Sequence, residues 1–185
     1  MALIPEILNG FQEFITKGAS VINTDHSSIH KGIGVLTRDY LDLAGSAVQE
    51  YCLTTHDGDY IHFKNLTVKT LGSSVKVSII KNATITDNTG DILPVNNPND
   101  VSTRIPKSEI RKNPVYTGGE EWEYVVALAD STNQSVGVTS ISQSVNEELV
   151  MPPGESYIIR IEELKGDPAE VFWRAFFYEE PEGVV

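Results

Sequence analysis

From residue 33 onward, apolar and polar residues alternate in short runs, and this alternation is the feature that most constrains the fold. In "SSVKVSIIKN", for example, Val75, Val77 and Ile79 share one face of an extended chain, opposite Lys76 and Ser78. Turn signals such as "HDGD", "LGSS", "DNTGD", "YTGGEE" and "MPPGE" separate the runs. No run between them has a helical period. We therefore expect an antiparallel β-sandwich or jelly roll, not a parallel α/β fold.

Other runs have the same character. In "EYCLTT", Tyr51 and Leu53 share a face, and "EVFWRAFFYEE" places Val171, Trp173, Ala175 and Phe177 together. The run "YIHFKNLTVKT" changes phase around Lys64 and Asn65, which predicts a β-bulge. The apolar positions are Ile61 and Phe63 before this slip, and Leu66 and Val68 after it.

The first twenty residues differ from the rest, because their apolar residues recur at helical spacing. Pro5 suits a first helical position and Gly18 suits a C-terminal cap, so we expect an amphipathic helix over roughly residues 5–17. This predicts a segment 1–20 followed by a sandwich domain 21–185. The helix either packs on its own domain or docks on a neighbouring subunit. Its apolar face consists of Ile4, Ile7, Leu8, Phe11, Phe14 and Ile15.

Residues 94–121 are predicted to form one long polar loop. They contain four prolines and four asparagines and have little periodicity. Loops of this length are usually functional or mobile. The loop is either partly disordered in an isolated domain or laid across a neighbour in an assembly. Together with the N-terminal helix it is the expected source of partner contacts, and its candidate residues are Asn96, Asn97, Arg104 and Arg111.

Charge excludes several functions. The chain has 185 residues, 14 lysines and arginines, and a formal net charge of −12. Nucleic acid and anionic lipid repel such a surface, so neither is expected as a partner. No stretch approaches the roughly 20 apolar residues of a membrane helix. Cys52 is the only cysteine, which rules out an intrachain disulfide; we expect a buried thiol.

The four histidines lie in two clusters, "TDHSSIH" and "THDGDYIH". Zinc needs three or four ligands with suitable spacing, and His62 should point away from the face of Ile61 and Phe63. No HExxH, P-loop or GxSxG motif is present. We therefore predict no metal, no cofactor and no catalytic residue. The aromatics either pack in the core, which their alternation favours, or line a carbohydrate platform; they are Trp122, Tyr124, Trp173, Phe176 and Tyr178.

The order of several stretches resembles small structural proteins of tailed bacteriophages. The stretches are "IHKGIGVL", "EYCLTT", "DYIHFKNLTVKTLGSSVKVSIIKNATITDNTGDILPVNNPND", "VMPPGESYIIRIEEL" and "VFWRAFFYEE", which span roughly residues 26–180. The chain departs from the family at "NPNDVS", where an Asn-Arg-x-Ser-like element often follows Pro-Val-Asn. The matching positions are His30, Gly32, His62, Phe63, Asn96, Tyr157, Tyr178 and Glu179.

This resemblance implies a non-enzymatic virion protein, assembled in the host cytoplasm. The expected role is a head decoration or cement protein that binds the major capsid protein or other virion proteins. It also implies a homo-oligomer, for which a trimer is one option. The alternative is a tail or baseplate component, or a receptor-binding module that uses its aromatics on sugar.

Overall fold

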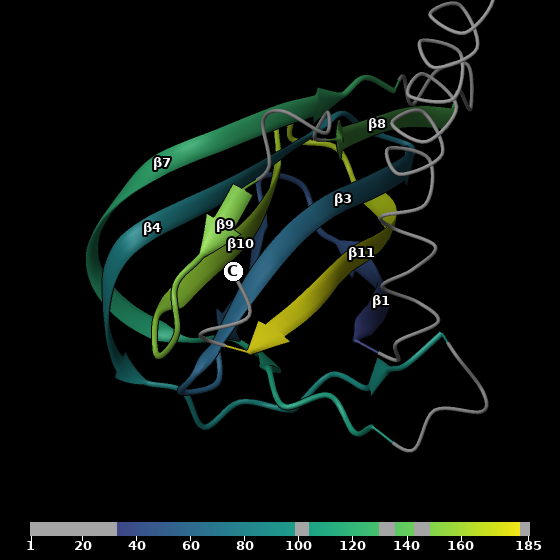
Figure 1. Cartoon of the computed structure of the whole chain (residues 1–185). Coiled ribbons are helices and arrows are strands. Elements are labelled where there is room, and N and C mark those ends of the chain that lie inside the picture. Colours follow the sequence, from purple (N-terminus) through teal and green to yellow (C-terminus); the bar gives the residue numbers. More distant parts are fainter. Residues whose placement is uncertain (1–32, 99–103, 130–135, 143–148, 182–185) are drawn as a thin grey trace, which may run out of the picture.

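The structure is a computed structural model that describes residues 33–98, 104–129, 136–142 and 149–181. These residues form eleven β-strands and no helix (Figure 1). The strands build two antiparallel sheets, which confirms the predicted mainly-β class and is consistent with a β-sandwich. The expected helix over residues 5–17 lies outside the described residues. Within the described part of the chain, no helix has the length and apolarity needed to cross a membrane.

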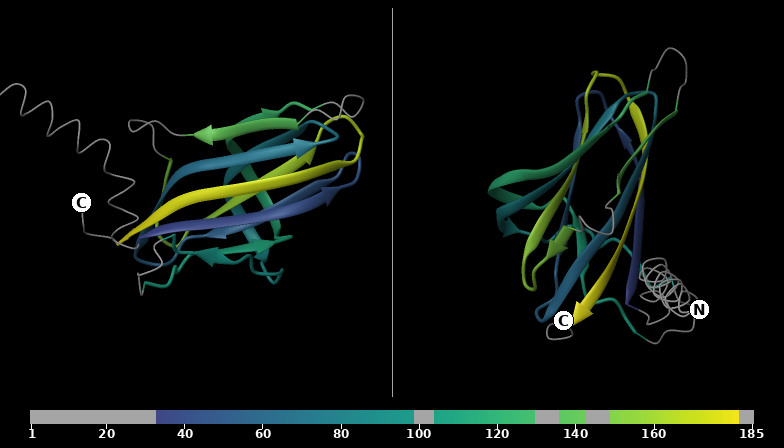
Figure 2. Two further views of the ribbon diagram at one scale, coloured as in Figure 1. Left: turned by 90° about the vertical axis from the view of Figure 1, so that its right-hand side faces the viewer. Right: turned by 45° about the horizontal axis from the view of Figure 1, so that its top comes forward.

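The six-stranded sheet, called sheet A, runs in the order β5, β1, β11, β3, β8, and β9 also pairs with β3. Its strands are β1 (Gly34–Leu43), β3 (Asp59–Leu71), β5 (Val95–Asn96), β8 (Val136–Ser142), β9 (Leu149–Met151) and β11 (Ala169–Pro181). The five-stranded sheet, sheet B, runs in the order β6, β2, β10, β4, β7. Its strands are β2 (Val48–Thr54), β4 (Val75–Asp87), β6 (Glu109–Lys112), β7 (Val115–Ala127) and β10 (Ser156–Glu163). Figure 2 shows the two sheets as separate layers.

The core lies between the sheets and is formed by the faces that alternation predicted. Val171, Trp173, Ala175 and Phe177 are all fully buried on the inner face of β11. Tyr51 of sheet B meets Trp173 edge-on, with ring centroids 4.8 Å apart. Such aromatic pairs bury large apolar areas. The layers are therefore joined by a continuous apolar interior.

The predicted bulge in β3 is present. The pairing of β3 with β11 passes from Asn65 opposite Phe176 to Phe63 opposite Phe177, which leaves Lys64 as the extra residue. This keeps Phe63 and Leu66 both in the core although they are an odd number of residues apart. Beyond the bulge, the side chains of β3 resume their alternation between the core and the opposite face of sheet A.

The segment 94–121 is more regular than the expected single loop. Strands β5 and β6 and the first half of β7 lie within it, and its four prolines all fall outside these strands. The signal "YTGGEE" is not a turn: Gly118 and Gly119 lie inside β7 with φ of 67° and 95°. There β7 pairs with the end of β4 (Figure 1), and a Cβ on Gly119 would lie 2.7 Å from Ile80 Cγ2. A left-handed φ and close packing against the Ile80 side chain, not chain reversal, explain this glycine.

A buried carboxylate joins the turns at one end of the sandwich. Glu163, at the end of β10, is 4% exposed. It accepts hydrogen bonds from the backbone N–H groups of Ser46, Lys165 and Gly166 at 2.6, 2.7 and 2.8 Å, and from the Ser73 hydroxyl. Burial opposes ionisation, but these four donors outweigh it and lower the pKa of Glu163 to about 2. One side chain thus connects three turns, each of which joins a strand of one sheet to a strand of the other.

Candidate binding surface on sheet A

The outer face of sheet A presents side chains in registered rows across four strands. One row places Arg38 of β1 opposite Arg174 of β11, which lies opposite Thr67 of β3. The next row contains Tyr40, Phe172, Lys69 and Val138, and the row beyond it contains Asp42, Glu170, Leu71 and Val136. We call this surface the outer face. It points away from the core and carries the candidate site.

Three cations on the outer face have no ionic partner in the described part of the chain. Arg38, Lys69 and Arg174 are exposed, and they form no ion pair or hydrogen bond with the described residues. Like charges directly opposite one another, as Arg38 and Arg174 are, destabilise a sheet. By contrast, these described cations all pair with carboxylates: Lys76, Lys81, Arg104, Lys107, Arg111, Lys112 and Arg160. On a chain of net charge −12, the outer face is therefore a local exception.

Apolar groups surround these cations. Val136 and Val138 of the edge strand β8 are 61% and 60% exposed. On the other side of the cations, a hollow of about 270 Å³ is lined by Leu36, Asn65, Pro98, Arg174 and Phe176. Mixed apolar and cationic groups on a pleated face favour contact with another macromolecule.

The far end of the outer face is acidic. Tyr40 donates hydrogen bonds to Glu170 Oε2 at 3.0 Å and to Asp42 Oδ1 at 3.2 Å. The bond to Glu170, with smaller contributions from desolvation and Asp42, raises the pKa of Tyr40 to about 12. The hydroxyl therefore remains a donor at neutral pH. Charge on the outer face changes sign along the strands.

A clamp of buried carboxylates holds the arm, residues 104–108, against sheet A. Glu179 of β11 is fully buried and accepts hydrogen bonds from the backbone N–H groups of Lys107 at 3.0 Å and Ser108 at 2.7 Å. Asp59 is 1% exposed, and its Oδ2 lies 2.6 Å from Lys107 Nζ. Arg104 Nη2 lies 3.8 Å from Glu179 Oε2 and 4.0 Å from Asp59 Oδ1. The arm is therefore fixed by backbone and ionic contacts together.

The four polar residues predicted to meet a partner occupy different settings. Asn96 is exposed on β5, opposite Leu36, at the edge of sheet A. Asn97 donates to the Arg104 carbonyl at 3.3 Å, and Arg104 belongs to the clamp. Arg111 lies on β6, and its Nη2 is 2.9 Å from Glu109 Oε2. Asn96 therefore lies on the edge strand of sheet A, and the partner role of all four stays a prediction.

Each described histidine lies beside a carboxylate. His56 Nδ1 is 3.3 Å from Asp59 Oδ2, and His62 Nε2 is 3.0 Å from Glu180 Oε2. His62 points to the outer face, as predicted from alternation, and stacks on Tyr178 with centroids 4.5 Å apart. Among the described residues, no group of three or more His, Cys, Asp or Glu side chains is arranged to hold a metal ion. His26 and His30 lie outside the described residues.

Cys52 is fully buried, as predicted, and burial raises the pKa of its thiol above the ordinary value. Its sulfur lies 3.6 Å from the Thr54 hydroxyl. A buried, protonated thiol is a poor nucleophile.

The positions that carry the resemblance fall mainly at the clamp end of sheet A. Tyr178 and Glu179 lie on β11, opposite His62 and Ile61 of β3, and Phe63 is in the core beside Phe177. Tyr157 lies in sheet B, where its ring contacts Trp122. His30 and Gly32 lie outside the described residues. Of the described positions, some pack in the core, as Phe63 does, and others belong to the clamp, as Glu179 does.

Comparisons with known proteins give no family. No family model matches the chain, and no curated protein matches it. A Yersinia pseudotuberculosis-derived mitogen is 9% identical over 80% of this chain and 91% of its own, with a TM-score of 0.30. The extra small virus VLP of the prawn Macrobrachium rosenbergii is 11% identical over 80% of each chain, with a TM-score of 0.33. The weak structural neighbours thus include a viral particle, but scores this low carry no functional inference.

Sequence reasoning missed the cations of the outer face. Arg38 and Arg174 are far apart in the chain, and only the β1–β11 register makes them neighbours. Arg174 interrupts the apolar run "VFWRAFF" at an outward position, which is the one signal the sequence offers.

Proposed function

We propose that the chain is a non-enzymatic structural protein of a tailed-bacteriophage virion, a decoration or cement protein that binds the major capsid lattice as a homo-oligomer. The outer face of sheet A supports the homo-oligomer in this proposal, because it combines Arg38, Lys69 and Arg174, which form no ion pair with the described residues, with exposed Val136 and Val138. Such a surface suits contact with protein. Weak contacts of this kind add up when they repeat over a lattice.

The resemblance of residues 26–180 to virion proteins supports the same role. Particle contacts are assigned to the apolar side of segment 1–20 and to the polar stretch that begins at Asn96. Deleting residues 1–20 should abolish co-sedimentation with heads while the near-UV circular dichroism of the sandwich, which comes chiefly from its tryptophans and tyrosines, is unchanged. Undiminished binding of the deleted protein would remove segment 1–20 from the interface.

Quantitative mass spectrometry of purified virions and empty heads tests the function itself. We expect the polypeptide in both, in a fixed stoichiometric ratio to the major capsid protein, and cryo-EM should place it on the head exterior. Absence from the particles would refute the proposal. A low copy number confined to tails would instead indicate a tail or baseplate component.

A further inference from the structure

We propose that copies of this chain join by placing an acidic tip of one copy on the cationic outer face of sheet A of the next. The acidic tip consists of Asp57 and Glu155. This deepens the proposed function, which includes a homo-oligomer, by naming the two surfaces that meet. The biological role of this contact rests on the proposed function, whereas the contact itself can be measured with the purified chain.

Two turns build the acidic tip. Asp57 lies in the turn between β2 and β3, and Glu155 lies in the turn between β9 and β10. Thr55 joins them: its backbone N–H donates to the Glu155 carbonyl at 2.9 Å, and its hydroxyl accepts the Glu155 N–H at 2.8 Å. A Cβ placed on Gly154 would lie 2.9 Å from Asp57 Oδ1. The two acidic residues are therefore neighbours, although they are distant in sequence.

The carboxylates of the tip have no charged partner in the part of the chain that the structure describes. Asp57 and Glu155 are exposed, and their side chains form no hydrogen bond or ion pair with the described residues. Elsewhere in the described chain most exposed acids already have a partner, as Glu120 does with Lys81 and Glu109 does with Arg111. Unpaired cations and unpaired acids thus sit on separate surfaces of one molecule.

Charge complementarity favours a second copy as the occupant. The three cations, which have no ion pair with the described residues, lie on one face of a chain whose net charge is −12. An arginine pair such as Arg38 and Arg174 offers forked donors that match carboxylates. Nucleic acid fits poorly, because Asp42 and Glu170 at the end of the same face would repel phosphates.

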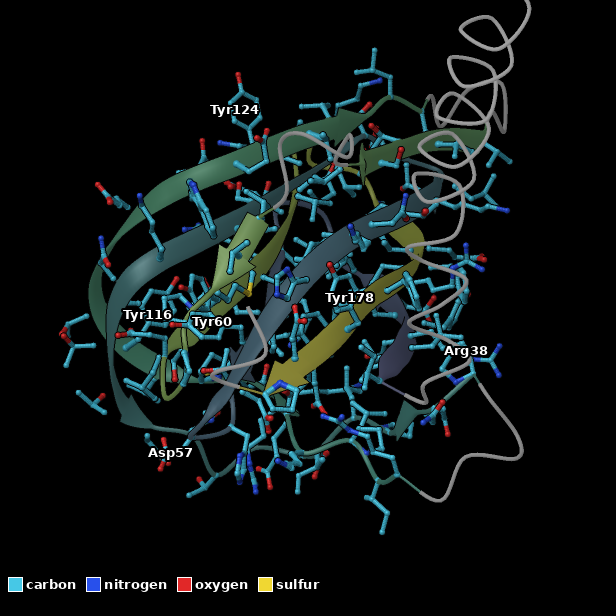
Figure 3. The ribbon with its side chains drawn as sticks, viewed as in Figure 1. Arg38, Asp57, Tyr60, Tyr116, Tyr124 and Tyr178 are labelled. Atoms are coloured by element: carbon cyan, nitrogen blue, oxygen red, sulfur yellow. The ribbon has the colours of Figure 1, made fainter. Side chains whose placement is uncertain are left out.

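The two surfaces are placed so that one copy can use both at once. Figure 3 shows Arg38 and Asp57 on different sides of the molecule. A contact between two different patches is heterologous, and repeating it gives a closed ring or an open chain. A trimer is one such ring.

Analytical ultracentrifugation of purified full-length variants tests the contact. Reversing the face with Arg38→Glu and Arg174→Glu should weaken self-association roughly tenfold or more, because attractive pairs become repulsive. Reversing the tip with Asp57→Lys and Glu155→Lys should weaken it similarly. Combining all four changes restores opposite charges and returns the net charge to −12, so association should recover.

Net charge provides the matched control. The face variant carries −16, and so does a variant with Lys76→Glu and Lys81→Glu, whose changes lie on β4 of sheet B; this control should associate like the wild type. The tip variant carries −8, so general repulsion alone would strengthen its association, opposite to our expectation. Near-UV circular dichroism checks folding of each variant.

Four results would overturn the inference: a monomeric wild type at every concentration, equal weakening in the control, stronger association of the tip variant, or no recovery in the combined variant. None of these bears on whether the polypeptide occurs in virions.

Discussion

At the scale of single residues, buried carboxylates hold this sandwich together outside its apolar core. Glu163 shows how. It takes four hydrogen bonds from three turns, and the resulting fall of its pKa from 4.5 to about 2 corresponds to roughly 3 kcal/mol of stability. That value is a large fraction of the stability of an ordinary domain. The turns at this end therefore depend on one ionised side chain.

Replacing Glu163 by glutamine tests this role. Glutamine keeps the shape but loses the charge and points an NH₂ group at N–H donors, so we expect a loss of about 2 kcal/mol. Urea unfolding followed by circular dichroism measures it. Glu162→Gln is the matched control, because Glu162 is 40% exposed and its ion pair with Arg160 is long, with Oε2 3.8 Å from Nε. Its effect should stay below about 1 kcal/mol; equal losses in the two variants would contradict the argument.

The same group predicts an acid dependence. Because the folded pKa of Glu163 lies below the unfolded value, its contribution is complete above about pH 4.5 and is lost as pH falls toward 2. The difference in unfolding free energy between wild type and Glu163→Gln should therefore shrink over this window. Urea titrations at pH 6, 4 and 2.5 measure the difference. A difference that does not change with pH would assign the effect to packing.

At the scale of strands, alternation predicted those parts of the fold in which one face is buried. The inner faces of β2, β3, β4 and β11 and the β3 bulge follow directly from the sequence, because burial enforces the period of two. The first half of β7 was missed. It pairs only with the end of β4 and is largely exposed, so no burial marks its period, and Gly118 and Gly119 imitate a turn.

The irregular part of β7 makes a prediction about these glycines. Gly119→Ala combines a φ of 95° with a Cβ 2.7 Å from Ile80 Cγ2 and should cost about 2 kcal/mol. Gly118→Ala has a φ of 67° and no heavy atom within 4 Å, so only backbone strain of about 1 kcal/mol is expected. Thermal unfolding of both variants compares them. A larger loss for Gly118→Ala would show that contact with Ile80 is not the reason for Gly119.

The clamp makes a prediction about the arm. In Glu179→Gln, the side-chain amide would direct a donor toward the N–H groups of Lys107 and Ser108, which should cost about 1–3 kcal/mol locally. Hydrogen exchange at these two amides should speed up by at least roughly tenfold. Glu180→Gln is the control, since Glu180 contacts His62 instead. Unchanged exchange in Glu179→Gln would mean that other contacts hold the arm.

At the scale of the whole molecule, the net charge could be read from the sequence, but the distribution of charged residues over the surface could not. The net charge of −12 correctly describes most of the surface, yet the pairing of β1 with β11 and β3 gathers Arg38, Lys69 and Arg174 on one face. Likewise Asp57 and Glu155 meet because two turns pair through Thr55. In both cases, contacts between segments that are distant in the sequence decide which charged residues become neighbours. The candidate site therefore could not be assembled from local patterns, although each strand that carries it could.

Net charge also predicts how stability responds to salt. Mutual repulsion at −12 destabilises the compact state, and it is screened as the Debye length falls from about 30 Å at 0.01 M to about 10 Å at 0.1 M salt. Exposed ion pairs such as Lys81–Glu120 weaken too, but each contributes at most about 1 kcal/mol. We expect repulsion to dominate, so the Tm at dilute protein should rise by about 3 °C over this range of sodium chloride.

The variant with Asp57→Lys and Glu155→Lys separates the two contributions. Its net charge is −8, and because repulsion grows with the square of charge, its gain in Tm should be roughly half that of the wild type. Its described ion pairs are unchanged, since neither Asp57 nor Glu155 belongs to one. Differential scanning calorimetry of both proteins measures the gain. A Tm that falls with salt in both would mean that the ion pairs outweigh repulsion and that the acidic surface costs the fold little.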